Sequence, residues 1–231
     1  YLVILLAALF IGVVVGGIIE RGLLRYMYDR DEVVMVLLTY AVFLILEDVM
    51  KLIWGVESYM PYQPRYLLGN ISVMGLPFVI YDLCLIFLAL VVGISVWLGL
   101  NKTRPGKLLV AVIHDREMAV TIGINVGRVF TVTFIIGAIL GALGGAFTAP
   151  LISVSPGIGV EIIVLAFAVV VIGGLGSIEG AAVGAIIVGL GRASAVHLLP
   201  QAELFIVFAV MTLVLLIRPH GLFGRQTLRK I

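Results

Sequence analysis

Four ionisable side chains stand next to one another in the segment from His114 to Arg128 (HDREMAVTIGINVGR), within a chain in which only 12% of residues are charged. The four are His114, Asp115, Arg116 and Glu117. The sequence shows no Ser-His-Asp arrangement and no Cys/His cluster at metal-ligand spacing, so we predict neither catalytic residues nor a metal site. A short charged helix can instead dock in a groove of another protein or lie on a lipid surface. Because an anionic leaflet repels acidic residues, we favour protein docking.

The residues around this segment favour a short helix with defined ends. Pro105 is expected to stop a helix before the segment, the stretch 107–122 contains neither Pro nor Gly, and Gly123 is expected to end it. Its apolar positions are Leu108, Val112, Met118 and Ile122. The loop 101–128 is therefore expected to carry one helix with an apolar side and a charged side.

A second group of charges lies inside an apolar run. Glu47 and Lys51 are four residues apart, the spacing at which an acid and a base on one helix form an ion pair. Charged groups within a membrane helix usually face a cavity or a partner, so Glu47 and the adjacent Asp48 are candidates for a translocation path. An ion pair at the outer membrane surface is the other interpretation, and both stay open.

Three more charged residues fall near the ends of apolar runs. Asp82 is expected at the outer membrane interface, and Arg192 is expected to extend its guanidinium group to the same interface. Glu161 stands at the start of an apolar run, where a carboxylate can stabilise a helix N-terminus.

Glycines recur at positions that could let helices approach closely. Small residues four apart share one helix face, and in a bilayer such faces are a main route to tight packing. The packing candidates are Gly12 with Gly16, the series Gly137, Gly141 and Gly145, and Gly180 with Gly184. A Gly-rich break between two apolar runs is either a tight turn or part of a translocation path, and it contains Gly173, Gly174 and Gly176.

The chain is strongly apolar, with 62% hydrophobic residues over 231 positions and a mean hydropathy of +1.25. Its apolar runs approach or exceed the roughly 18 residues that span a hydrocarbon core as a helix. None shows the alternation of a membrane β-barrel strand. The sequence therefore predicts an all-α, polytopic transmembrane helical bundle. The seven expected spans are 1–19, 33–54, 79–100, 129–149, 160–175, 181–199 and 203–218.

Basic residues set the expected orientation of these spans. When alternate loops are assigned to the cytoplasm, twelve of the 15 Lys and Arg residues fall on that side, as the positive-inside rule requires. They lie in the loops 20–32 and 101–128 and from residue 218 onward. The chain opens at Tyr1 inside an apolar run, so we expect that it lacks its true N-terminus. We expect one transmembrane domain over 1–231.

The sequence contains no phosphate-binding loop. Its Gly106-Lys107 pair is followed by Leu108 and lacks a Gly five residues earlier. Energy for any active process must therefore come from another subunit or from an ion gradient.

The charged segment resembles a known signature. Glu117, Ala119 and Gly123 are spaced as in the Glu-x-Ala-x-x-x-Gly motif of ABC importer permeases. In that group of proteins the motif forms a cytoplasmic coupling helix that seats on the ATPase subunit. The resemblance implies an ATPase-coupling role for the motif and for the residues just before it, His114, Asp115 and Arg116.

Longer segments resemble the branched-chain amino acid permease family. The likeness covers 111–125 around the motif, the Gly-rich segment 171–181 and the ending 218–224, RPHGLFG. The chain departs from the family pattern at Ile113, where the family usually has Arg, and at Glu179, where it usually has Pro.

The resemblance implies a permease subunit of an ATP-driven ABC importer in the cell (inner) membrane that moves branched-chain or related amino acids by alternating access. It implies a second permease subunit, with a heterodimer expected, an external substrate-binding protein and two cytoplasmic ATPase subunits that bind ATP and Mg²⁺. No cofactor in this chain and no nucleic acid is implied.

Three other interpretations stay open. The substrate could be urea, a short amide or an aromatic carboxylate, since a weakly binding apolar cavity suits them almost as well. An ion-coupled secondary transporter could use Glu47, Asp48 or Asp82 to carry protons, with broken helices at the midplane. The third is a structural membrane subunit without a transport path.

Overall fold

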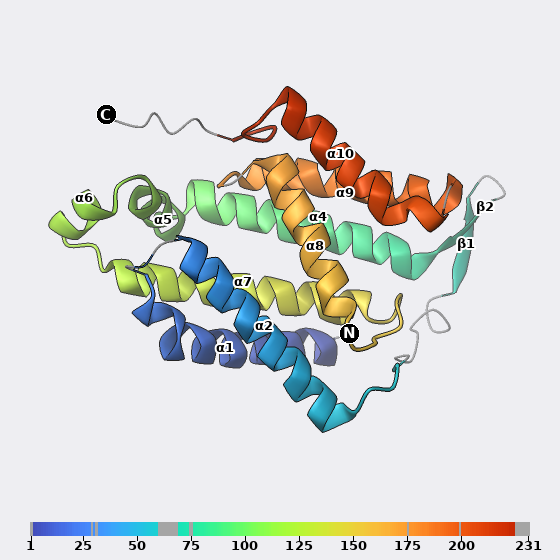
Figure 1. Cartoon of the computed structure of the whole chain (residues 1–231), viewed down its shortest axis with the longest axis horizontal. Coiled ribbons are helices and arrows are strands. Elements are labelled where there is room, and N and C mark those ends of the chain that lie inside the picture. The colour runs from blue at the N-terminus through green and yellow to red at the C-terminus, as the bar shows by residue number, and fades with distance from the viewer. Residues whose placement is uncertain are drawn as a thin grey trace. The chain divides into compact units, whose positions relative to one another are not determined.

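In the residues that it describes, the computed structural model shows helices, turns and a two-stranded hairpin. It describes residues 2–28, 30, 32–59, 69–73, 76–174, 176–198 and 200–224. By their contacts the residues form two compact units, Tyr1–Pro156 and Gly157–Ile231. Figure 1 shows the elements of both units. The single domain expected from the sequence stays a prediction.

The first unit is built around two long apolar helices that lie side by side, α1 and α7 (Figure 1). Gly12 and Gly16 are buried at their contact, and a Cβ atom on Gly12 would lie 2.6 Å from the Cα of Ile139. A Cβ on Gly16 would meet the side chain of Ala138 at 2.7 Å. The predicted role of Gly12 and Gly16 in close helix packing is confirmed. The helices of this unit are α1 Leu2–Gly22, η1 Leu24–Tyr26, α2 Glu32–Trp54, α4 Ile80–Lys102, α5 Arg104–His114, α6 Arg116–Thr121 and α7 Val126–Thr148.

A two-stranded antiparallel hairpin interrupts the helices before α4. Strand β1, Asn70–Val73, pairs with β2, Leu76–Val79, in the register that sets Asn70 opposite Val79. The sequence predicts helices alone, because four-residue strands beside long apolar runs leave little periodic signal. The fold remains a helical membrane bundle with one small hairpin.

The second unit packs three helices around a small apolar core. Its elements are α8 Ile158–Gly173, α9 Ile178–Leu198, the 3₁₀ turn η2 Pro200–Ala202 and α10 Glu203–Ile217. Ala168 and Ile172 of α8, Val188 of α9 and Val207 of α10 are buried against one another. Each of these helices thus contributes an apolar side to the core.

The long helices lie where the hydropathy of the sequence placed them. Within the described part of the chain, seven helices match the seven expected spans to within three residues at each end. Those long and apolar enough to cross a membrane are Leu2–Tyr26, Ile80–Lys102, Val126–Thr148 and Ile178–His197, while Ile158–Gly173 and Phe205–Ile217 are apolar but shorter. The chain is a multi-pass membrane protein, and seven crossings stay a prediction.

The segment between α7 and α8 is bent rather than helical. Val154 exchanges two main-chain hydrogen bonds with Tyr59, which follows α2, at 2.8 and 3.0 Å. Gly157 then adopts a left-handed φ of +95° and precedes the first turn of α8. The re-entry of 150–159 into the membrane stays a prediction.

Candidate functional site

The loop between α4 and α7 folds into two short helices, and the first begins at the residues expected to stop one. Thr103 caps α5 by accepting a hydrogen bond from the Gly106 amide at 3.3 Å, and Pro105 occupies the first turn. Proline suits this turn, because the amide hydrogen that proline lacks would have no partner there and its φ is already helical. Helix α4 ends at Lys102, so the expected helix stop around Pro105 is confirmed, and Pro105 also helps to start α5.

The expected single helix over 107–122 is interrupted at Asp115. Asp115 has extended backbone torsions, φ −152° and ψ 97°, and its carboxylate accepts a hydrogen bond from the Met118 amide at 2.9 Å. An aspartate in this position satisfies an amide that the helix leaves unpaired. The polar cluster is thus divided, with His114 at the end of α5 and Arg116 and Glu117 in the first turn of α6.

Helix α6 ends as expected at Gly123, whose φ is +84°. The Gly123 amide donates to the Val120 carbonyl and the Ile124 amide donates to the Ala119 carbonyl, both at 3.0 Å. This pair of bonds is the Schellman arrangement, in which a glycine takes the left-handed conformation after the helix. The motif glycine is therefore required by backbone conformation.

The motif alanine anchors α6. Ala119 is 2% exposed and packs with Val112 of α5 and Val126 of α7. Every other residue of α6, including Glu117, is exposed. The three motif positions thus have distinct roles in this chain: Ala119 fixes the helix, Gly123 ends it, and Glu117 faces outward.

Arg116 joins α6 to the segment that follows α1. Its Nη1 donates to the main-chain carbonyl of Tyr28 at 3.1 Å. Its guanidinium carbon lies 6.0 Å from the ring centre of Phe130, and the same ring lies 4.8 Å from the ring of Tyr28. A cation and two aromatic rings therefore connect α6, α7 and the turn after α1.

A buried acid contacts the same tyrosine, and the sequence alone did not indicate it. Glu20, in the last turn of α1, is fully buried. Its Oε1 accepts hydrogen bonds from the Tyr28 hydroxyl at 3.2 Å and from the Thr131 hydroxyl of α7 at 2.8 Å. Burial, together with the Glu20 carboxylate, raises the pKa of Tyr28 to about 12, so the phenol stays a donor. The only sequence signal was a single acid in the last turn of an apolar run.

The charges of α2 pair within their own helix. Lys51 Nζ lies 2.9 Å from a carboxylate oxygen of Glu47 and 3.3 Å from one of Asp48. The ion pair expected from the spacing of Glu47 and Lys51 is confirmed. The Glu47 side chain is 14% exposed and that of Asp48 is 73% exposed, so only Glu47 is sheltered. Their role in a translocation path stays a prediction.

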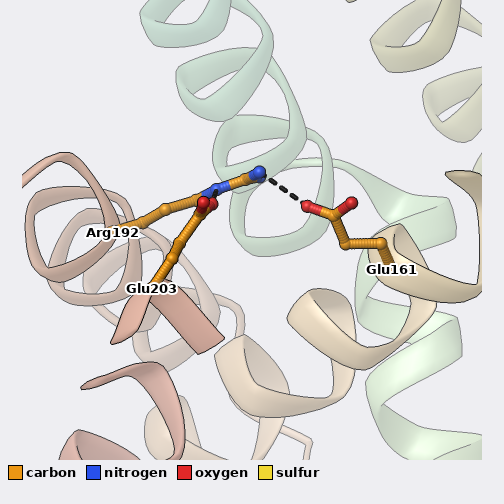
Figure 2. Close-up of polar contacts among 3 residues, drawn as sticks. All are labelled: Glu161, Arg192 and Glu203. Atoms are coloured by element: carbon orange, nitrogen blue, oxygen red, sulfur yellow. Dashed lines mark hydrogen bonds and ion pairs between the residues drawn. The ribbon is translucent and has the colours of Figure 1, made fainter. Parts of the chain in front are cut away.

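In the second unit Arg192 holds three helices together, as Figure 2 shows. Its Nη2 lies 2.6 Å from Oε1 of Glu161, in the first turn of α8, and its Nε pairs with Oε1 of Glu203, in the first turn of α10. Two carboxylates thus compensate the charge of Arg192, and its extension to the outer membrane interface stays a prediction. Glu161 stands near a helix N-terminus as expected.

The Gly-rich break forms a close backbone contact with the RPHGLFG ending. The amides of Leu222 and Phe223 donate to the carbonyls of Ile172 and Gly173, at the end of α8, both at 2.9 Å. A Cβ on Gly174 would overlap the backbone of Gly224, and Gly174 has a φ of +99°. Two segments recognised separately in the sequence therefore form one structural element.

The candidate glycines differ in their surroundings. Gly173, Gly180 and Gly184 lie where α8 and α9 meet, and a side chain on any of them would overlap the backbone of the facing helix. Gly176 has a φ of +80° and open space around it, and Gly137, Gly141 and Gly145 also face open space within the described chain. The packing roles of Gly180, Gly184 and the α7 series, and a path role for the break, stay predictions.

The chain is similar to known proteins along nearly its whole length. The family model described as branched-chain amino acid transport system / permease component matches residues 1–216. The chain is 27% identical over 238 residues to LivH of Escherichia coli (strain K12), a high-affinity branched-chain amino acid transport system permease protein, an alignment that covers 99% of this chain and 77% of LivH. It is 30% identical over 169 residues to BraD of Pseudomonas aeruginosa, which has the same description, covering 72% of this chain and 55% of BraD.

A shorter stretch of the chain is similar to a permease that is named for a different solute. The chain is 40% identical over 87 residues to the nucleoside ABC transporter permease protein NupC of Lactococcus lactis subsp. cremoris, covering 38% of this chain and 27% of NupC. No solved structure matches the chain at a significant level. Because the family model covers nearly the whole sequence, the chain belongs to the family of permease components of branched-chain amino acid transport systems.

Proposed function

We propose that this chain is the membrane subunit of an ATP-driven importer that moves branched-chain or related amino acids inward by alternating access. The observation that carries the proposal is the geometry of α6. One buried alanine and one left-handed glycine hold a short helix whose remaining side chains, including Glu117, are exposed. A helix held in this way can fit a groove of a partner protein.

The proposed partner at α6 is a cytoplasmic ATPase subunit. The sequence has no phosphate-binding loop of its own, so ATP and Mg²⁺ would bind to two ATPase subunits. A second permease subunit and an external substrate-binding protein would complete the importer. The positive-inside rule supports a cytoplasmic position for the 101–128 loop.

The proposed substrate class rests on the names of the relatives. LivH and BraD are named for branched-chain amino acids, whereas NupC, which matches a shorter stretch, is named for nucleosides. An importer supplied by a binding protein needs only a weakly binding path, so specificity is expected to lie mainly in that protein.

Reconstitution tests this function. The chain would be co-expressed with the neighbouring transport genes, purified in mild detergent and placed in proteoliposomes that contain ATP. We expect ATPase subunits to co-purify, and we expect uptake of leucine, isoleucine or valine to require ATP and the binding protein. Uptake that follows an imposed pH gradient and persists without ATP would contradict the proposal and favour an ion-coupled carrier. Urea, short amides, aromatic carboxylates and nucleosides serve as competing solutes.

A further inference from the structure

The buried carboxylate of Glu20 has no part in the docking surface itself. It lies in the last turn of α1, is fully buried, and uses only Oε1, which receives the hydroxyls of Tyr28 and Thr131. Its Oε2 is also buried and has no hydrogen-bond donor among the described residues. Because burying a carboxylate with incomplete hydrogen bonding is unfavourable, this position calls for an explanation other than stability.

The same Tyr28 is held from two sides. Its hydroxyl donates to Glu20, while its main-chain carbonyl accepts from Arg116 of α6. Its ring packs at 4.8 Å, centre to centre, against Phe130 of α7. A continuous path of contacts therefore runs from the exposed helix α6, through Tyr28, to a buried carboxylate that lies between α1 and α7.

The helices at the far end of this path are suited to move as one body. Gly12 and Gly16 bring the backbones of α1 and α7 so close that a Cβ on Gly12 would overlap the backbone of Ile139. Interfaces packed to this degree do not deform continuously, so force applied at one end displaces the pair together.

We propose that Glu20 is a positioning residue for energy coupling. It pins Tyr28 to the ends of α1 and α7, so that a displacement of α6 by the ATPase subunit is passed through Arg116 and Tyr28 to the α1–α7 pair. This inference rests on the proposed contact between α6 and the ATPase subunit.

The hydrogen bond between Tyr28 and Glu20 can be removed by substitutions that keep the neighbouring contacts. Tyr28→Phe removes the hydroxyl but keeps the ring against Phe130 and the carbonyl that receives Arg116. Thr131 Oγ1 also lies 2.9 Å from the Gly127 carbonyl, so it retains an acceptor when Glu20 is changed to Gln. Tyr26→Phe is the matched control, because Tyr26 is 73% exposed on the same turn.

The test measures solute imported per ATP hydrolysed in proteoliposomes that contain the complete transporter, together with the amount of bound ATPase subunit. We expect Tyr28→Phe and Glu20→Gln to retain bound ATPase subunits and to lower this ratio about tenfold, within the usual range of coupling between sites. Tyr26→Phe should match the wild type. An unchanged ratio in Tyr28→Phe would overturn the proposal.

A double substitution separates force transmission from general structural damage. If Arg116 and Tyr28 act in one path, Arg116→Met in the Tyr28→Phe background should lower the ratio no further. Independent losses that multiply would contradict the path. Glu117→Lys tests the proposed contact between α6 and the ATPase subunit separately. If that contact exists, Glu117→Lys should lower the amount of solute imported per ATP, whatever the result for Tyr28→Phe.

Discussion

Oε1 of Glu20 lies 2.8 Å from the hydroxyl of Thr131, a residue 111 positions later in the chain. This contact joins the end of α1 to the start of α7, and Glu20 also accepts a hydrogen bond from Tyr28, whose main-chain carbonyl receives Arg116. The first unit therefore has a buried hydrogen bond between α1 and α7 at the same end as α6. The contacts of Gly12 and Gly16 hold the same two helices together further along their length.

Replacing Thr131 should remove the hydrogen bond to Glu20 and lower the stability of the protein. Thr131→Val keeps the shape of the side chain and removes the donor to Glu20, so we expect a loss of about 1 to 2 kcal/mol in the free energy of unfolding. Thr133→Val is the matched control, because the Thr133 hydroxyl donates only to the Val129 carbonyl of its own helix in the described structure. Thermal unfolding of the purified protein in detergent provides the comparison. Equal effects of the two substitutions would show that the Glu20 contact has no special weight.

The contact between α1 and α7 should reject a side chain at Gly12. Gly12→Leu places a Cβ 2.6 Å from the Cα of Ile139, so the backbones must separate. We expect a loss at or above the roughly 1 to 3 kcal/mol typical of overpacked cores. Gly17→Leu on the same helix meets no atom within 4 Å at its Cβ and should be tolerated. Expression level and detergent melting temperature would distinguish the two variants.

The geometry of α6 makes a prediction for each motif residue that packing or conformation fixes. Gly123→Ala forces a side chain into a left-handed conformation, which costs about 1 to 2 kcal/mol. Ala119→Leu overfills a position that is 2% exposed, whereas Val120→Leu changes one that is 57% exposed. We expect the first two to reduce substrate-stimulated ATP hydrolysis in the assembled transporter and the third to leave it near the wild-type level. A wild-type rate of substrate-stimulated ATP hydrolysis in both Gly123→Ala and Ala119→Leu would show that coupling does not require a fixed conformation of α6.

The ion pairs of Arg192 should contribute modestly to the stability of the protein, and this contribution should fall as the salt concentration rises. The Arg192 and Glu161 side chains are 41% and 42% exposed, so solvent screening limits each pair to about 1 kcal/mol or less. Arg192→Met should lower the melting temperature of the protein, and the difference should shrink as NaCl is raised. In a Glu161→Gln/Glu203→Gln background the same substitution should have little effect. A full effect in that background would indicate that packing of the arginine stem matters more than its charge.

The ionisation of Tyr28 has a defined pH window. Because burial and the Glu20 carboxylate raise its pKa from 10.0 to about 12, the folded state favours the neutral phenol. The stabilisation is therefore fully present below about pH 10 and is lost as pH rises through about 12. In a protein with ¹³C-labelled tyrosine, the resonance that disappears in Tyr28→Phe should show no ionisation at pH 10.5. Glu20→Gln should lower this pKa in part, since burial remains; ionisation of wild-type Tyr28 near pH 10 would contradict the contact.

Periodicity and composition predicted the helices well, because a membrane span depends on the summed hydropathy of many residues. The ends of the long helices fall within three residues of the prediction. The loop 101–128 was predicted less accurately. Pro105 and Asp115 can each start or interrupt a helix, and only the tertiary contact of Ala119 with Val112 and Val126 makes a separate α6 favourable.

The polar contacts were the least predictable part. Glu20 and Thr131 meet through packing of α1 on α7, and Arg192 meets Glu161 and Glu203 through packing of α8, α9 and α10. No local sequence pattern encodes such pairs, since their partners come from separate helices. The Glu47 and Lys51 pair was predictable because both residues belong to one helix turn.

The most direct test of the central claim is substrate-stimulated ATP hydrolysis by the reconstituted transporter with the charge of Glu117 reversed. Glu117→Lys alters an exposed side chain of α6, and Glu57→Lys makes the same change at another exposed glutamate, beyond α2. We predict that Glu117→Lys lowers stimulated hydrolysis and uptake together by tenfold or more, within the usual range of coupling between sites, while Glu57→Lys stays at the wild-type rate. Wild-type stimulation and uptake in Glu117→Lys would contradict the assignment of α6 as the contact with the ATPase subunit.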